Sequence, residues 1–173
     1  MAKILIINTG GTIAMSEDHS TGKVSPNGEN PLLSSAHLFH LIGDIHTEDL
    51  FNLPSPHMQE SHMMQLRKRI LTAVDEGYTG VVVTHGTDTL EETAYFLELT
   101  TNVSIPIVVT GAMRSSNEIG SDGLANLRSS LIVAASPESK DKGVVVVMND
   151  EVHTATYVTK THTTNVATFQ TPT

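Results

Sequence analysis

Four clusters of polar side chains stand directly after short apolar runs of the sequence. The clusters are Asn8-Thr9-Gly10-Gly11-Thr12, Thr84-His85-Gly86-Thr87-Asp88-Thr89, Thr110-Gly111-Ala112-Met113-Arg114 and Asn149-Asp150. A threonine hydroxyl becomes a nucleophile when a base takes its proton, and nearby glycine N–H groups can stabilise an oxyanion. A carboxylate at the same place can hold a cationic amine or orient the base. The clusters therefore favour hydroxyl-based nucleophilic chemistry.

Each of these residues also has a simpler interpretation. Gly10-Gly11-Thr12 can be a turn with Thr12 as a helix N-cap, and Thr87 and Asp88 are both good N-caps for a following helix. A phosphate-binding loop is a third possibility for the glycine pair. It lacks the third glycine of the dinucleotide fingerprint and the Gly-Lys-Ser/Thr ending of the nucleotide loop, so it is disfavoured.

Lys160 and His85 are the candidate bases. A desolvated lysine amine paired with Asp88 could take a threonine proton, but a lone lysine is most often a solvated surface group. His85 lies inside the second cluster, as a general base or as a structural histidine beside a strand end. The spacing alone does not show that Lys160 and Asp88 meet.

The nine histidines raise the question of a metal site. His37 and His40 have helical spacing, and His57 and His62 flank Glu60. There is no His-Glu-x-x-His motif, and a structural zinc site would usually use cysteine, which this chain lacks. We therefore expect neither a metal nor a cofactor.

Length and composition narrow the class of protein. The 173 residues suit one α/β domain, and 10 Lys and Arg against 19 Asp and Glu give a net charge of −9, which argues against nucleic-acid or anionic-membrane partners. Without cysteine, disulfides and thiolate nucleophiles are excluded. The apolar run at residues 4–7 is too short for a signal peptide, and no stretch approaches the ~20 residues of a membrane span. We expect a soluble cytoplasmic protein.

The elements that must position the clusters follow from apolar patterns. Short β-branched runs predict buried strands at residues 4–7, 81–83, 107–109 and 144–147. Helical spacing predicts helices over residues 61–76, 88–101 and 122–135, with a weaker helix over 32–42. This alternation predicts an α/β fold. We expect an open, doubly wound parallel sheet of the flavodoxin or Rossmann type, with helices on both faces, in a single domain over 1–173.

Ligands bind to such a sheet outside the carboxyl ends of its strands, near the point where the strand order reverses. The polar clusters all follow strands, so we expect them to converge there. Residues 16–31 are polar and rich in structure breakers, which suggests a mobile lid. The threonine-rich tail alternates over residues 154–161, which suggests one further strand.

Three motifs resemble the signatures of bacterial L-asparaginases, in the order and approximate spacing of that family. They are Thr9-Gly10-Gly11-Thr12-Ile13-Ala14, Thr84-His85-Gly86-Thr87-Asp88-Thr89 and Val158-Thr159-Lys160-Thr161. Residues 91–97 and 110–114 add to the likeness, which runs through essentially the whole chain. The resemblance implies hydrolysis of the side-chain amide of L-asparagine to L-aspartate and ammonia, without metal or cofactor.

The same resemblance implies roles for individual residues. Thr12 would be the primary nucleophile and would form an acyl-enzyme. A second set, Thr87, Lys160 and Asp88, would activate the nucleophile or the water. The residues assigned to substrate binding are Ser55 for the α-carboxylate, Asp88 for the α-ammonium group, Pro56, Gly86 and Ala112, whose backbone would lie near the reacting amide.

The chain departs from the family pattern at three points. The family's mobile loop usually carries a tyrosine near the nucleophile, whereas the first tyrosine here is Tyr78, and many members have Gln in place of Pro56. Family members also continue into a C-terminal domain that helps join chains into homodimers or tetramers and completes the neighbour's site. We therefore expect residues 1–173 to be the nucleophile-bearing domain without the C-terminal domain, with weak or absent activity by itself.

Two other functions stay open at the level of sequence. A related amidohydrolase would prefer L-glutamine to L-asparagine. A non-catalytic amino-acid-binding or interaction module would keep the pocket and perform no chemistry.

Overall fold

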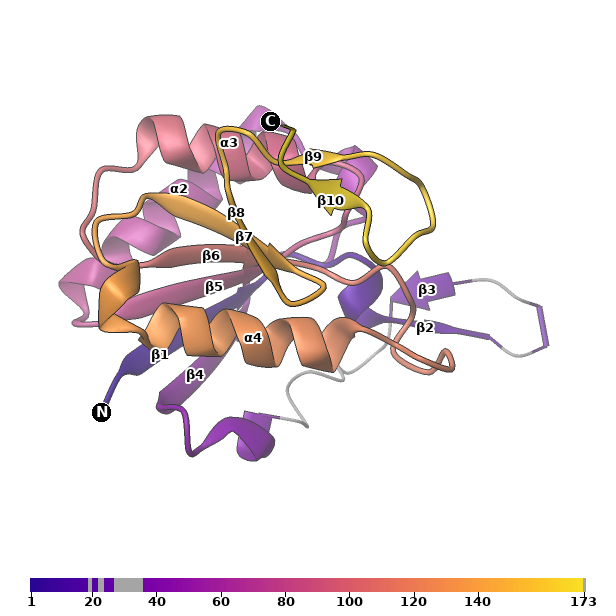
Figure 1. Ribbon diagram of the computed structural model, residues 1–173, viewed down its shortest axis with the longest axis horizontal. Helices are drawn as coiled ribbons and strands as arrows, with labels where there is room; N and C mark the ends of the chain where they lie inside the picture. Colours follow the sequence, from indigo (N-terminus) through magenta and orange to yellow (C-terminus); the bar gives the residue numbers. More distant parts are fainter. Residues whose placement is uncertain (19, 22–23, 27–35, 173) are drawn as a thin grey trace.

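A six-stranded sheet forms the centre of the chain in the computed structural model, which describes residues 1–18, 20–21, 24–26 and 36–172. Its strands are β1 (Lys3–Asn8), β4 (Asp44–Asp49), β5 (Gly80–Thr84), β6 (Ile107–Thr110), β7 (Val144–Met148) and β8 (Glu151–Thr154). Their order in the sheet is β4-β1-β5-β6-β7-β8 (Figure 1). All neighbours pair in parallel except β8, which runs antiparallel to β7. The predicted α/β sheet is confirmed, with one antiparallel edge strand added.

The four predicted strands are the four central ones. Every residue of β5, β6 and β7 is buried, because helices cover both faces of the sheet there. The two edge strands, β4 and β8, were not predicted. Both alternate polar side chains with few buried ones, so neither has the continuous apolar run that marks a central strand.

Among the described residues, three α-helices cover the sheet, as the spacing predicts: α2 (Glu60–Asp75), α3 (Leu90–Thr100) and α4 (Gly123–Ala135). Helices α2 and α3 lie on one face and α4 lies on the other (Figure 1). The fold is therefore doubly wound. None of the helices in the described part of the chain is long and apolar enough to cross a membrane.

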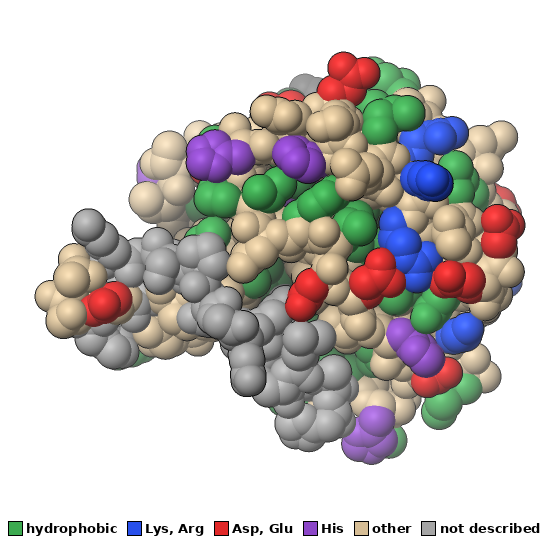
Figure 2. Space-filling model, turned by 180° about the vertical axis from the view of Figure 1, so that it is seen from behind, with side chains coloured by type: hydrophobic (Ala, Val, Ile, Leu, Met, Phe, Trp, Pro, Cys, Tyr) green, Lys and Arg blue, Asp and Glu red, His purple; other side chains and the backbone are tan. Residues whose placement is uncertain are grey.

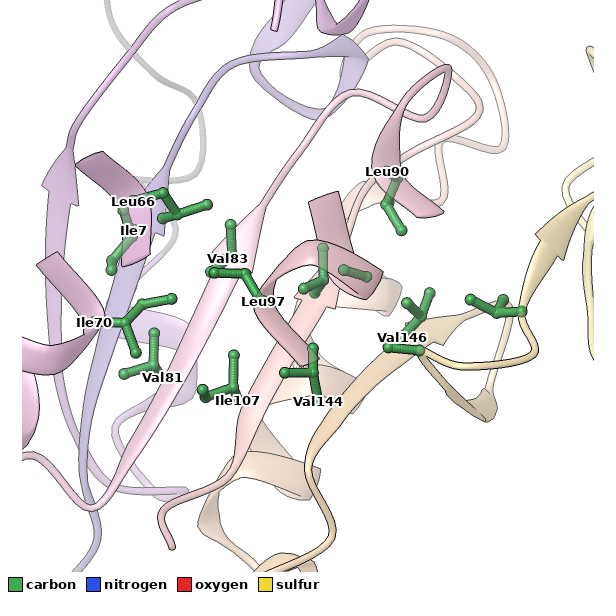
Figure 3. Packing of buried hydrophobic residues seen from close by; sticks show 14 of the residues in the cluster. Ile7, Leu66, Ile70, Val81, Val83, Leu90, Leu97, Ile107, Val144 and Val146 are labelled. Carbon is green, nitrogen blue, oxygen red and sulfur yellow. The ribbon is translucent and has the colours of Figure 1, made fainter. Parts of the chain in front are cut away.

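Each face of the sheet has its own hydrophobic core. On one face, Leu66 and Ile70 of α2 and Leu97 of α3 pack against the strands (Figure 3). The labelled strand residues in this cluster are Ile7, Val81, Val83, Ile107, Val144 and Val146. On the other face, Leu127 and Leu131 of α4 are fully buried. Burying one such side chain stabilises the fold by roughly 1.5–3 kcal/mol, so these clusters hold the sheet rigid beneath its loops.

Charged groups lie around the outside of these layers. On the face shown in Figure 2, the described Lys and Arg side chains lie among acidic and uncharged side chains. Arg69 of α2 contacts Glu48 of β4 at 2.8 Å and Glu76 at 2.9 Å. The pair with Glu48 attaches α2 to the edge strand of the sheet.

Two predictions concern the segment between β1 and β4. Strands β2 (Met15–Glu17) and β3 (Val24–Pro26) pair antiparallel in the stretch predicted as a lid. Residues 19, 22–23 and 27–31 of that stretch lie outside the described residues, so the lid stays a prediction.

The helix predicted over 32–42 is wrong where it can be compared, because Ala36–Phe39 form one 3₁₀ turn and residues 40–42 are not helical. Residues 32–35 lie outside the described part.

The tail after β8 is a separate hairpin rather than one strand over 154–161. The chain turns at residues 155–157, and β9 (Thr159–Lys160) then pairs antiparallel with β10 (Phe169–Gln170). Phe169 is buried in the core on the α2 and α3 face. This anchor brings the tail back over the sheet, beside α3 (Figure 1).

Candidate active site

The strand order reverses between β1 and β5. From β1 the chain adds β4 on one side, and it then crosses to place β5 on the other side of β1. A crevice outside the carboxyl ends of these two strands is the usual ligand site of an open α/β sheet. Thr12 follows β1 and Thr87 follows β5, so the topology brings the two hydroxyl-bearing loops to this point.

Glycine backbone lets the loops come into contact. Gly11 has a φ of 87°, and a Cβ placed on it would lie 2.3 Å from the Cα of Gly86. A Cβ on Gly86 would in turn lie 2.6 Å from the Cβ of Ser55. No side chain fits between these three segments, so they pack directly on one another. Thr12, Ser55 and Thr87 therefore share one small space.

That space is a pocket of about 320 Å³, a volume that suits a small ligand. Its lining consists of Gly11, Thr12, Met15, Pro54, Ser55, Pro56, Gly86, Thr87, Asp88, Met113, Lys160 and Thr163. Seven of the residues assigned to the site from the sequence line it. The eighth, Ala112, does not.

The lysine meets the hydroxyl and the carboxylate. Lys160 Nζ donates hydrogen bonds to Thr87 Oγ1 at 3.0 Å and to Asp88 Oδ1 at 2.8 Å. The lysine side chain is only 15% exposed, whereas that of Asp88 is 61% exposed. Lys160 is therefore not the solvated surface group that a lone lysine usually is. In its neutral form, this amine is placed to take the proton of the Thr87 hydroxyl.

Ser55 is fixed by the loop that carries this set. Its Oγ accepts a hydrogen bond from the backbone N–H of Asp88 at 3.1 Å, and its carbonyl accepts one from Thr89 Oγ1 at 2.8 Å. Ser55 is buried at the pocket wall, and accepting a bond leaves its hydroxyl able to donate one. The N-cap of α3 is Thr89, without a side-chain cap, so Thr87 and Asp88 do not act as caps.

His85 is a structural residue. Its Nδ1 lies 2.8 Å from the carbonyl oxygen of Gly86, which can only accept, and its Nε2 lies 2.9 Å from Thr93 Oγ1. The ring is therefore the neutral Nδ1–H tautomer, with Thr93 donating to Nε2. Burial lowers the pKa of His85 and favours this neutral form. With both ring nitrogens bound within the fold, His85 is not the base of the pocket.

The loop after β6 reaches the pocket through Met113. Ala112 is buried in the core beneath α4, which is why its side chain does not line the pocket. The Asp122 carboxylate accepts hydrogen bonds from the backbone N–H groups of Met113 and Arg114, both at 3.0 Å. The sequence located this loop at the site, but the apolar pattern does not tell which of two adjacent residues faces outward.

Sequence reasoning missed four lining residues: Met15, Pro54, Met113 and Thr163. Pro54 adjoins Ser55, and Met113 lies inside the predicted cluster at residues 110–114, where only its neighbour Ala112 was given a role. Thr163 lies between β9 and β10, where hydrogen bonds such as Thr161 N–H to the Thr168 carbonyl shape the loop. No spacing in the sequence indicates which residue of such a loop enters the pocket.

Fold and site together define a class: a doubly wound α/β domain in which hydroxyl, amine and carboxylate groups meet in a small pocket at the switch point. Comparison with known proteins makes the assignment specific. Residues 3–173 match the family described as "Asparaginase, N-terminal". The chain belongs to the asparaginase family.

Relatives of this family match nearly all of the chain. L-asparaginase 2 of Bacillus subtilis (strain 168) is 42% identical over 176 residues, covering 98% of this chain and 47% of its own length. L-asparaginase 2 of Escherichia coli (strain K12) is 42% identical over 176 residues, with 98% and 49% covered. The crystal structure of a probable cytoplasmic L-asparaginase from Campylobacter jejuni matches with a TM-score of 0.93 and 40% identity, over 99% of this chain and 53% of that one. The chain thus spans about half the length of the relatives it matches.

Proposed function

We propose that this chain is the nucleophile-bearing domain of an L-asparaginase, which hydrolyses the side-chain amide of L-asparagine to L-aspartate and ammonia. One observation carries the proposal: the Lys160 amine contacts both Thr87 and Asp88 in the pocket that Thr12 also lines. Membership of the asparaginase family supports the same activity. Hydrolysis of an amide needs a nucleophile and a route for protons, and these residue types supply both.

The first half of the reaction forms an ester on the enzyme. The Oγ of Thr12 adds to the amide carbon, and the proton of its hydroxyl passes through the neighbouring base to the amide nitrogen. The carbon–nitrogen bond then breaks and ammonia leaves. Thr12 is left bound to the aspartyl group. Backbone N–H groups of the Gly10-Gly11 turn are candidates to stabilise the oxyanion, because glycine lets the backbone approach closely.

The second half releases the product. A water oxygen adds to the ester carbon, its proton returns to the Thr12 oxygen, and the carbon–oxygen bond to Thr12 breaks to give L-aspartate. The Thr87, Lys160 and Asp88 set is the candidate for activating Thr12 or the water. When Lys160 takes a proton, the adjacent Asp88 carboxylate stabilises its positive charge.

The pocket also offers complementary groups for a free amino acid. The exposed part of the Asp88 carboxylate suits an α-ammonium group, and the Ser55 hydroxyl can donate to an α-carboxylate. Pro56 and Gly86 form neutral wall beside them. A small zwitterion needs one anionic contact and several neutral donors, which matches this arrangement.

Ammonia release tests the proposal. The 173-residue chain and its Thr12→Ala variant are incubated with L-asparagine and with L-glutamine, and L-aspartate binding is measured by calorimetry. We expect at most weak release from L-asparagine by this chain, and a loss of at least about 10³-fold, or to the detection limit, in Thr12→Ala, because the nucleophile is gone. Thr154→Ala, an exposed threonine of β8 away from the pocket, is the matched control.

Three results would contradict the proposal. Ammonia release that survives in Thr12→Ala would exclude Thr12 as the nucleophile. Faster release from L-glutamine would favour a glutaminase. L-aspartate binding by the unaltered chain, without turnover of either amide, would favour an amino-acid-binding module.

A further inference from the structure

The segment that carries Lys160 lies outside the six-stranded sheet. Strand β9 is two residues long and pairs with β10, apart from the six-stranded sheet. Phe169, opposite Lys160 in this hairpin, is anchored in the core. Val158, directly before β9, is buried in the same core, so both sides of the hairpin are anchored there and the polar residues of β9 are placed over α3 by further contacts.

Glu91, in the first turn of α3, supplies those contacts. One carboxylate oxygen, Oε1, accepts a hydrogen bond from Thr159 Oγ1 at 3.2 Å, and the other, Oε2, accepts one from the backbone N–H of Lys160. Both residues of β9 are therefore held by a single side chain, across sequence separations of 68 and 69 residues. A carboxylate is well suited to this, because its two oxygens accept along different directions.

The same helix end also carries the partners of the lysine ammonium. Thr87 and Asp88 lie just before α3, and Lys160 Nζ contacts both. The helix thus holds the lysine at two points: Glu91 holds its backbone, and the preceding loop holds its amine. Movement of β9 relative to α3 would change the distance between Lys160 Nζ and Thr87 Oγ1.

We propose that Glu91 is a positioning residue, whose carboxylate places the Lys160 amine against Thr87. The inference rests on the proposed function, because it concerns the same proton transfer. Glu91 does not line the pocket and so does not touch the substrate itself. Its effect depends on a side chain long enough to reach β9 and on two terminal atoms that can hydrogen-bond Thr159 Oγ1 and the Lys160 N–H. It does not depend on the negative charge.

Two substitutions of Glu91 separate the effect of its side-chain length from the effect of its negative charge. Glu91→Gln keeps the length of the side chain: its amide oxygen can accept from the Lys160 N–H, and its amide nitrogen can donate to the Thr159 oxygen. Glu91→Asp keeps the charge but is one methylene shorter, so it cannot reach both groups. Glu92, the exposed acidic neighbour in the same helical turn, provides matched controls as Glu92→Gln and Glu92→Asp.

Accessibility of the lysine is the first measurement. The four variants and the unaltered chain react with limiting acetic anhydride, and mass spectrometry gives the labelling rate of Lys160 relative to the exposed Lys68. We expect Glu91→Asp to raise the Lys160 rate about tenfold, the factor that loss of a hydrogen bond to a charged group corresponds to. Amide hydrogen exchange at Lys160 should accelerate in the same variant. The other three variants should match the unaltered chain.

Turnover is the second measurement. If ammonia release is present, Glu91→Asp should lower kcat about 10²-fold with little change in KM, because a misplacement of about 1 Å costs that much in rate and leaves the substrate contacts intact. Glu91→Gln should restore kcat. Any labelling pattern other than a change in Glu91→Asp alone overturns the inference, and a defect in Glu91→Gln alone would assign the effect to charge.

The two measurements fail independently. If the unaltered chain shows no turnover but the labelling pattern is as expected, the proposed function is contradicted, whereas the positioning of Lys160 by Glu91 is supported. If the unaltered chain turns over L-asparagine but Glu91→Asp leaves the labelling of Lys160 unchanged, the role proposed for Glu91 is wrong and the proposed function stands. Circular dichroism and thermal unfolding of each variant show that the comparison is between folded chains.

Discussion

The loops after β1 and β5 and the segment around Lys160 meet in one pocket, but they are held in different ways. The loops continue central strands whose backbones pair in the sheet, and they contact each other through Gly11 and Gly86. The lysine segment lies outside that sheet. It depends on side chains: Val158 and Phe169 in the core and the Glu91 carboxylate from α3.

The two kinds of support are sensitive to different changes. A backbone contact between loops tolerates no added carbon atom, since there is no side chain that can move aside. A segment held by side chains tolerates backbone adjustment but depends on the reach and the volume of a few groups. We therefore expect two kinds of substitution to disturb the pocket. In the loops after β1 and β5 it is the addition of a side chain to a glycine, and in the lysine hairpin it is the truncation of a side chain.

The largest effect is expected for Gly11→Ala. Its Cβ would lie 2.3 Å from the Gly86 Cα, at a φ of 87°, so the two loops must separate. We expect a loss of about 3 kcal/mol or more in the free energy of unfolding, measured with urea. Gly77→Ala is the matched control, with a φ of 80° and no atom within 4 Å of the added carbon, and should cost only about 1–2 kcal/mol. Equal costs would show that the loops are not locked by this contact.

Phe169→Ala comes next and tests the lysine side. Removing a buried aromatic ring typically costs about 3–5 kcal/mol, and we expect about 3 here if the hairpin unfolds together with the sheet. Urea unfolding followed by circular dichroism gives the value, and the exposed neighbour Gln170→Ala should stay within about 0.5 kcal/mol. A cost below about 1 kcal/mol for Phe169→Ala would mean that the tail opens independently of the core.

The smallest expected effect is the pH dependence of the free energy of unfolding that comes from His85, which follows β5. Burial holds the pKa of His85 below its ordinary value of 6.5, so the unfolded chain binds the proton first as the pH falls. The stability that depends on neutral His85 is complete above pH 6.5 and is lost below it, with a slope of at most about 1.4 kcal/mol per pH unit. Urea unfolding at several pH values should show a weaker dependence between pH 5 and 6.5 in His85→Gln. Identical slopes in the two proteins would assign the pH dependence to other groups.

The sequence was informative where burial is complete. The central strands are covered on both faces, so each appears as a continuous apolar run, and the helices between them carry apolar stripes. The edge strands β4 and β8 have one or more sides exposed and a polar composition. Pairing with a neighbour defines them, and that is a tertiary contact which local pattern does not record.

The site divides in the same way. Thr12 and Thr87 could be placed together by topology alone, because both follow parallel strands at the switch point. Lys160 was a candidate base by residue type, but its place beside Thr87 and Asp88 came from family resemblance. Its hairpin leaves the sheet, and its spacing from Asp88 carries no positional information. Glu91 appeared only as an acidic residue at a helix start, because its bonds to β9 depend on the folded path of the tail.

The distance along the chain between Lys160 and Thr87, 73 residues, has a consequence for biosynthesis. Translation proceeds from the N-terminus, so all six strands of the main sheet leave the ribosome ahead of the lysine. A nascent chain can bring its hydroxyl groups together while the amine is still to be added. The contact between Lys160 and Thr87 can therefore form only after both hydroxyl-bearing loops have been synthesised.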